Sequence, residues 1–249
     1  IHVQLCLHRA PGYVIFDGGD KEPASLKTDA GAQKAFCDLW RAFARRYRGI
    51  PNERLSFNPV NEPDGFSEAQ YARVFAAVLI AIREEDPNRF VMLDGRWCAS
   101  KPVPLFRDFR STGQAFRGYT PHAITHYGMS YIPDQPVREP GWPIEPDIID
   151  KRWIFEMPRT TMDKYVGHAQ QGYPVMIGEF GCANKVKHET ALRWMEYCLK
   201  MWKENNLSWA IWNLDGPFGF LDSGRPDVDY EDFNGHKLDR RMLELLQRH

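Results

Sequence analysis

The sequence lacks several features that would point to common functional classes. No apolar run approaches the roughly 20 residues of a membrane span, and no basic start leads into an apolar leader. The formal net charge is only -1 and the basic residues form no long block, which argues against a nucleic-acid groove or a polybasic membrane patch. The sequence therefore favours a partner that is neither nucleic acid nor membrane.

Metal and nucleotide sites are also poorly supported. The five cysteines are odd in number and have neither a CxxC pair nor zinc-like spacing, so we expect mostly free thiols. No glycine-rich phosphate loop or internal repeat is present. The acidic stretch 222–235 lacks a glycine where a calcium loop needs it, and it is better interpreted as a solvated loop. We expect neither a metal nor an organic cofactor.

The chain is long and apolar enough to bury one sizeable core. It has 249 residues, of which 43% are hydrophobic and 13% aromatic. This composition predicts a single domain over residues 1–249. The aromatic rings suit either the core or stacking on sugar faces, and the sequence leaves both uses open.

Strand and helix patterns alternate along the chain, as in parallel sheets. Strands are predicted at 1–7, 54–64, 89–94, 114–120, 174–179 and 207–212, and helices at 29–48, 67–85, 103–109, 159–171, 188–204 and from 238 to the end. Residues 121–157 form a long connection that we interpret as a binding loop. Six such units predict an α/β fold of the TIM-type (β/α) barrel, truncated at the N-terminus by two units.

Two predicted strands lead into a glutamate, and barrel enzymes place functional residues at the carboxyl ends of strands. One stretch leads to Glu62 and the other to Glu179. A pair of carboxyl groups about 5 to 5.5 Å apart is what a retaining glycosidase uses as nucleophile and acid/base. Asn61 could hydrogen-bond a sugar hydroxyl beside them, although Asn61 and Glu62 could equally cap the following loop.

Three motifs together resemble glycoside hydrolase family five, over essentially the whole chain. They are Asn61-Glu62-Pro63, Ile177-Gly178-Glu179-Phe180-Gly181 and Trp209-Ala210-Ile211-Trp212. The resemblance implies Glu62 as acid/base and Glu179 as nucleophile. It also implies that His8 is an active-site histidine and that Trp212 is an aromatic platform.

The sequence departs from this family in two places. The family's His-x-Tyr on the sixth strand is matched by Arg117-Gly118-Tyr119, so Arg117 replaces the histidine; an alternative register uses His126 and Tyr127. For His126, loop packing and substrate contact both remain open. The first two strands are absent from this sequence, and with them the arginine that usually supports the nucleophile. Because this leaves sheet edges uncovered, we expect a homo-oligomer that covers those edges, or a domain-swapped assembly.

Further residues are candidates for substrate binding. The aromatic candidates lie near predicted strand ends or in the long loop, and they are Trp97, Trp142 and Phe218. The polar candidates lie at strand ends, and they are Arg9 and Asp215. For these two polar residues, a structural salt link is as good an interpretation as substrate binding.

The resemblance implies a retaining endo-β-1,4-glucanase that acts on a β-linked polysaccharide outside the cell, without a cofactor. The alternatives are the same mechanism on mannan, xylan or mixed-linkage glucan, or a carbohydrate-binding remnant with little turnover.

Overall fold

The computed structural model describes residues 2–15, 23–106, 109–132, 135–145 and 156–249. Its internal contacts divide the chain into two compact units. The N-terminal unit comprises Ile1–Phe116 and His168–Val175, and the C-terminal unit comprises Arg117–Gly167 and Met176–His249. The single domain expected from composition stays a prediction.

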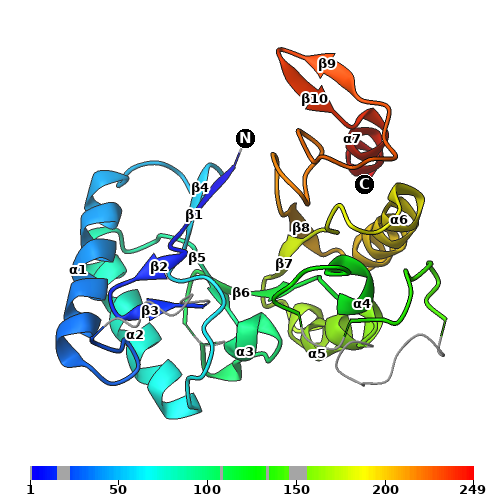
Figure 1. The fold of residues 1–249 in the computed structure, drawn as a ribbon. Helices are drawn as coiled ribbons and strands as arrows, with labels where there is room; N and C mark the ends of the chain where they lie inside the picture. The colour runs from blue at the N-terminus through cyan, green and yellow to red at the C-terminus, as the bar shows by residue number, and fades with distance from the viewer. Residues whose placement is uncertain (1, 16–22, 107–108, 133–134, 146–155) are drawn as a thin grey trace. The chain divides into compact units, whose positions relative to one another are not determined.

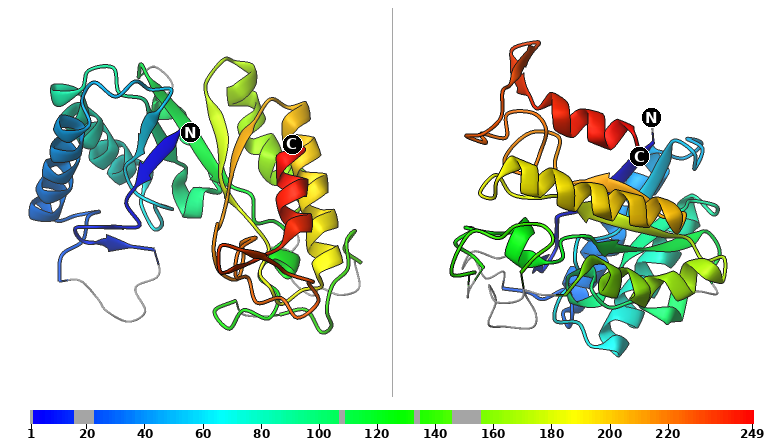
Figure 2. Two further views of the ribbon diagram at one scale, coloured as in Figure 1. Left: turned by 90° about the horizontal axis from the view of Figure 1, so that it is seen from above. Right: turned by 90° about the vertical axis from the view of Figure 1, so that its right-hand side faces the viewer.

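The N-terminal unit alternates strands with helices (Figure 1). Its elements are β1 (Val3–Cys6), β2 (Arg9–Ala10), β3 (Tyr13–Val14), α1 (Ala30–Arg46), β4 (Leu55–Asn58), α2 (Glu68–Glu85), β5 (Val91–Asp94), α3 (Arg96–Ala99), the 3-10 helix Pro104–Phe106 and all but the last residue of β6 (Thr112–Arg117). The β1–β4, β4–β5 and β5–β6 pairs are parallel. Helices α1 and α2 lie side by side in both Figure 1 and Figure 2.

Both long helices of this unit begin where their sequences provide a cap. The Asp29 carboxylate accepts the Ala32 N–H of α1 at 2.7 Å. At α2, Ser67 and Gln70 form a reciprocal capping box. Helix α2 buries its apolar stripe, whereas α1 buries Phe36, Trp40 and Ala44 but leaves Leu39 40% exposed. The ring of Trp40 lies 5.1 Å from that of Phe57 on β4.

The C-terminal unit continues the same alternation. It holds α4 (His122–Thr125), most of α5 (Pro158–Gln170), β7 (Val175–Phe180) from Met176 on, α6 (His188–Glu204), β8 (Ser208–Ile211), β9 (Glu231–Phe233), β10 (His236–Leu238) and α7 (Arg240–Gln247). Strands β7 and β8 are parallel, whereas β9 and β10 form an antiparallel hairpin. The six long strands are hydrogen-bonded in the order β1-β4-β5-β6-β7-β8. The fold is therefore a TIM-type (β/α) barrel truncated to six strands.

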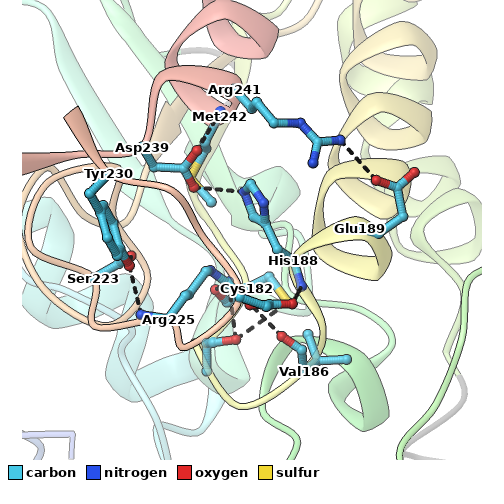
Figure 3. Close-up of polar contacts among 12 residues, drawn as sticks. Cys182, Val186, His188, Glu189, Ser223, Arg225, Tyr230, Asp239, Arg241 and Met242 are labelled. Carbon is cyan, nitrogen blue, oxygen red and sulfur yellow. Dashed lines mark hydrogen bonds and ion pairs between the residues drawn. The ribbon is translucent and has the colours of Figure 1, made fainter.

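A buried arginine in the segment after β8 binds the loop between β7 and α6 (Figure 3). The Arg225 guanidinium donates to the carbonyl oxygens of Cys182 and Val186 at 2.7 and 2.9 Å. Farther along, His188 and Asp239 form a buried pair with 2.7 Å between Nε2 and Oδ2. These contacts join α6 to the chain segment that leads into α7.

The structure also gives partners to the acidic stretch 222–235. Its Asp227 carboxylate accepts the backbone N–H of His188 at 2.8 Å, at the beginning of α6. The same stretch contains β9, so it is not a loop throughout. All five cysteines are free, which confirms the prediction of free thiols.

Some predicted boundaries were wrong for physical reasons. The strand predicted at 54–64 ends at Asn58, because Pro59 has no N–H to continue the ladder and the chain bends there. The strand predicted at 114–120 is β6, which ends at Arg117. The helix predicted at 103–109 is only a short 3-10 turn among the residues described. The long connection 121–157 contains α4, and part of it lies outside the described residues.

Candidate active site

Glu179 lies on β7 with its carboxylate between two side chains from the end of β6. Arg117 Nη2 is 3.4 Å from Oε1, and the Tyr119 hydroxyl donates to Oε2 at 3.0 Å. Only 15% of the Glu179 side chain and 7% of the Arg117 side chain are exposed. The adjacent cation and hydroxyl donor favour the ionised form of a carboxylate, whereas burial opposes it.

Gly118 makes this arrangement possible. Its N–H donates to the Glu179 carbonyl at 2.8 Å, which brings the segment after β6 close to β7 at this point. A Cβ at position 118 would lie 2.8 to 2.9 Å from Trp202, Ile177 and Phe180, so only glycine permits the approach. Side chains two residues apart on extended chain point to the same side, and Arg117 and Tyr119 therefore both reach Glu179.

Two further rings, those of His126 and Phe218, lie next to the Tyr119 ring. The rings of His126 and Phe218 lie 5.1 and 6.2 Å from that of Tyr119, and 5.4 Å from each other. Burial lowers the pKa of His126 to about 3, with a smaller contribution from His122, whose pKa burial also lowers. His126 is thus neutral near pH 7, and Arg117 provides the positive charge beside Glu179.

Glu62 lies past the end of β4, in a turn rather than on the strand. Its φ is +49°, a left-handed conformation that costs energy for a residue with a side chain. The Glu62 N–H donates to Asp94 Oδ2 at 2.8 Å, and its carbonyl accepts the Tyr13 hydroxyl at 2.6 Å. The neighbouring Asn61 is buried and its N–H donates to the Leu7 carbonyl at 2.9 Å.

Asp94 is a residue of this region that the sequence analysis missed. It ends β5 with no exposed surface, and its Oδ1 accepts a hydrogen bond from the side-chain amide of Asn58 at 2.8 Å. The signal was available, because Asp94 is an acidic residue at the end of a buried strand, like the glutamates that were selected. Tyr13, which binds the Glu62 carbonyl, comes from the short β2–β3 hairpin and has no such signal.

The candidate sugar-binding tryptophans differ in exposure and partners. Trp97 is 48% exposed and begins a run of three left-handed residues, with the Lys101 ammonium 5.1 Å from its ring centre. Trp212 is 38% exposed just after β8. Trp142 packs its ring against Tyr197 of α6 at 5.2 Å, which gives it a structural contact.

The remaining candidates follow strand ends. His8 and Arg9 are exposed after β1, with Arg9 paired to Val14 in the β2–β3 hairpin. Asp215 lies beyond β8, where its backbone forms an isolated β-bridge with that of Leu221. Across the described ranges, no group of three or more histidine, cysteine or acidic side chains is placed to hold a metal ion. Within the same ranges, no helix has both the length and the apolar character for a membrane span.

The chain is similar in sequence to proteins named as a β-xylosidase and as an endoglucanase. "Beta-xylosidase" of Phanerodontia chrysosporium is 28% identical over 236 residues, which cover 85% of this chain and 44% of the relative. "Endoglucanase C" of Acetivibrio thermocellus is 24% identical over 271 aligned residues, covering 98% of this chain and 74% of the relative. The chain therefore spans less than half of the xylosidase and about three quarters of the endoglucanase.

Solved structures agree with the fold, and a family model identifies the family. A crystal structure described as a glycoside hydrolase matches with a TM-score of 0.87 and 36% identity, over 100% of this chain and 76% of that one. A hyperthermophilic endo-β-1,4-glucanase in complex with substrate matches with a TM-score of 0.66 at 21% identity, over 86% of this chain and 66% of that one, and shows the fold alone. The family model described as cellulase (glycosyl hydrolase family 5) matches residues 3–217. The chain belongs to glycosyl hydrolase family 5.

Proposed function

We propose that this chain is a retaining endo-β-1,4-glucanase in which Glu179 is the nucleophile and Glu62 the acid/base. The observation that carries the proposal is the Glu179 carboxylate, held at the end of a barrel strand by Arg117 and Tyr119. A nucleophilic carboxylate must stay ionised to attack, and these two neighbours favour that form.

The reaction has two displacements. In the first, Glu179 attacks the anomeric carbon while Glu62 protonates the departing glycosidic oxygen, which leaves a covalent glycosyl-enzyme. In the second, Glu62 removes a proton from water, the water attacks the same carbon, and Glu179 is released as a carboxylate. The mechanism needs the two carboxyl groups about 5 to 5.5 Å apart.

The other candidates take supporting roles in this proposal. Asn61 would bind the sugar hydroxyl next to the reacting carbon, and His8, Arg9 and His126 would contact other hydroxyls. The exposed rings of Trp97 and Trp212 suit stacking on sugar faces. Trp142 would do so only with the ring surface that Tyr197 does not cover.

The family supports the chemistry more strongly than it supports the polymer. Matching proteins are named as an endoglucanase and a β-xylosidase, and one fold match is a Thermotoga maritima Cel5A structure in complex with mannotriose at 20% identity. Soluble cellulose, mannan, xylan and mixed-linkage glucan therefore belong in one assay. Cellulose is our choice because four of the matching sequences are named endoglucanases, and the match covers 74% of the length of three of them.

Trapping the intermediate is the sharpest test. We expect a fluorosugar cellobioside with a dinitrophenyl leaving group to label the peptide that contains Glu179, as read by mass spectrometry. Glu179→Gln should abolish the label, and Glu62→Gln should slow hydrolysis of soluble cellulose by about 10²- to 10⁴-fold. Glu196→Gln, the same change at an exposed position of α6, is the matched control.

Two outcomes would overturn the proposal. A label on another residue would exclude Glu179 as nucleophile. Absence of both label and reducing sugar, with oligosaccharide binding retained, would indicate a carbohydrate-binding protein instead.

Location outside the cell and a homo-oligomer belong to the same proposal. Strands β1 and β8 are the outermost strands of the sheet order, and Val3 on β1 is 52% exposed. Exposed strand edges favour pairing with another chain. Sedimentation velocity that shows only monomer at micromolar concentration would contradict the oligomer.

A further inference from the structure

The backbone of Glu62 is fixed by two side chains from distant parts of the N-terminal unit. Its N–H is bound by the Asp94 carboxylate at 2.8 Å and its carbonyl by the Tyr13 hydroxyl at 2.6 Å. These partners are 32 and 49 residues away in sequence. A left-handed residue that is not glycine persists only where its surroundings determine its conformation, and such residues gather at functional sites.

Asp94 is itself held firmly. It is completely buried, its second oxygen binds the Asn58 amide at 2.8 Å, and its carbonyl accepts the hydroxyl of Tyr71. Residue 94 also pairs with Ala115 in the β5–β6 ladder. The carboxylate therefore has little freedom to follow Glu62 if the turn moves.

Tyr13 binds the other side of the same turn. Its hydroxyl donates to the Glu62 carbonyl and accepts the Asp64 N–H at 2.7 Å, so it spans three residues of the chain. The ring is 6% exposed and lies 5.6 Å from that of Phe66. Burial raises the pKa of Tyr13 well above its usual value, so the hydroxyl keeps its proton and continues to donate.

We propose that Asp94 and Tyr13 are positioning residues that aim the Glu62 carboxyl at the leaving oxygen. This inference rests on the proposed role of Glu62 as acid/base. Neither residue transfers a proton; each holds the peptide from which the acid projects. Proton transfer depends on placing the acid within hydrogen-bond distance of the oxygen, so loss of either anchor should harm protonation more than any other step.

Substrates with different leaving groups distinguish a loss of acid positioning from a loss of stability. A dinitrophenolate departs without protonation, whereas phenolate needs the acid. For Asp94→Asn and Tyr13→Phe we expect kcat/KM on phenyl β-cellobioside to fall by about 10²-fold, and on dinitrophenyl β-cellobioside by less than about threefold. A residue that serves only stability would lower both rates equally.

The matched control is Tyr173→Phe. Tyr173 is also a buried tyrosine of the N-terminal unit, but its hydroxyl donates to the Thr112 hydroxyl at 3.4 Å rather than to Asp94 or Glu62. We expect the ratio of the two rates in this variant to stay within about threefold of the parent. Equal losses on both substrates in Asp94→Asn and Tyr13→Phe would overturn the inference.

Glu62→Gln distinguishes this failure from failure of the proposed function. If Glu62→Gln loses both rates equally, Glu62 is not the acid, and both the function proposed for it and the inference fall. If Glu62→Gln loses the phenyl rate selectively but the anchor variants do not, only the inference falls.

Amide hydrogen exchange gives a readout that does not need turnover. In Asp94→Asn, we expect the Glu62 amide to exchange at least about tenfold faster, because its acceptor is weakened, while the Val78 amide in α2 keeps its rate. Unchanged exchange at Glu62 would show that Asp94 does not restrain the turn. Equal acceleration at both amides would show a general loss of stability instead, and either result overturns the inference.

Discussion

The two glutamates proposed for catalysis differ in the contacts that the structure gives them. The Arg117 guanidinium and the Tyr119 hydroxyl contact the Glu179 carboxylate. The Asp94 carboxylate and the Tyr13 hydroxyl bind the backbone of Glu62. The contacts to Glu179 act on the place and the charge of a carboxylate, whereas these contacts to Glu62 act on its place.

This difference matches the two duties. A nucleophile works in one protonation state, so a permanent cation beside it is an advantage. An acid/base must gain and lose a proton in each cycle, so its position relative to the leaving oxygen is what the protein has to fix. Anchoring through the main chain fixes the position from which the Glu62 side chain projects.

Removing the cation at Glu179 should give the largest effect among the variants that spare both glutamates. We expect Arg117→Met to lower kcat/KM on soluble cellulose by about 10²-fold and to move the acidic limb of its pH profile upward by about one unit or more, because an adjacent cation favours the ionised carboxylate. Arg117→Lys keeps the charge without the planar fork, and its acidic limb should stay near that of the parent. An unshifted limb in Arg117→Met would show that Arg117 serves only packing.

Removing the hydroxyl at Glu179 should cost less. Tyr119→Phe deletes one hydrogen bond to a charged group, for which we expect a loss of about 10-fold in kcat/KM and a smaller upward shift of the acidic limb than in Arg117→Met. Tyr127→Phe is the control, because the alternative register of the sequence motif would assign that tyrosine instead. A larger loss in Tyr127→Phe than in Tyr119→Phe would restore the alternative register.

The sequence predicted most of what depends on local pattern. Helices α1, α2 and α6 have clear apolar periodicity and lie close to where we expected them. Glu179 was found because β7 is a short apolar run that carries the residue within the strand. Arg117 and Tyr119 were selected from a motif; the structure places both against Glu179, and their roles stay a prediction.

What the sequence could not predict depends on partners far along the chain. The turn that carries Glu62 was read as strand, because its shape is set by distant groups such as Trp40, whose indole N–H donates to the Pro59 carbonyl at 3.0 Å. Asp94 was visible as the end of a strand, but nothing local shows that it binds the Glu62 amide. Tyr13 lies in a two-residue strand, too short for any periodic signal.

The smallest effect concerns the neutral histidine behind Tyr119. Because burial lowers the pKa of His126 to about 3, the unfolded chain binds a proton at pH values where the folded chain does not. The stability of the C-terminal unit should then fall as pH drops below about 6.5 and continue to fall toward the folded pKa. Between pH 7 and pH 5 this one histidine accounts for about 1 to 2 kcal/mol of unfolding free energy.

Urea unfolding followed by tryptophan fluorescence at several pH values measures this slope. His126→Gln should flatten the slope between pH 7 and pH 5, whereas His236→Gln should not, because the exposed His236 has its pKa raised by a hydrogen bond to Asp222. That bond stabilises the folded chain at low pH and is lost as pH rises, which is the opposite sign. If His126→Gln keeps the full slope, the ring is hydrated in solution, and the dry setting inferred beside Glu179 does not hold.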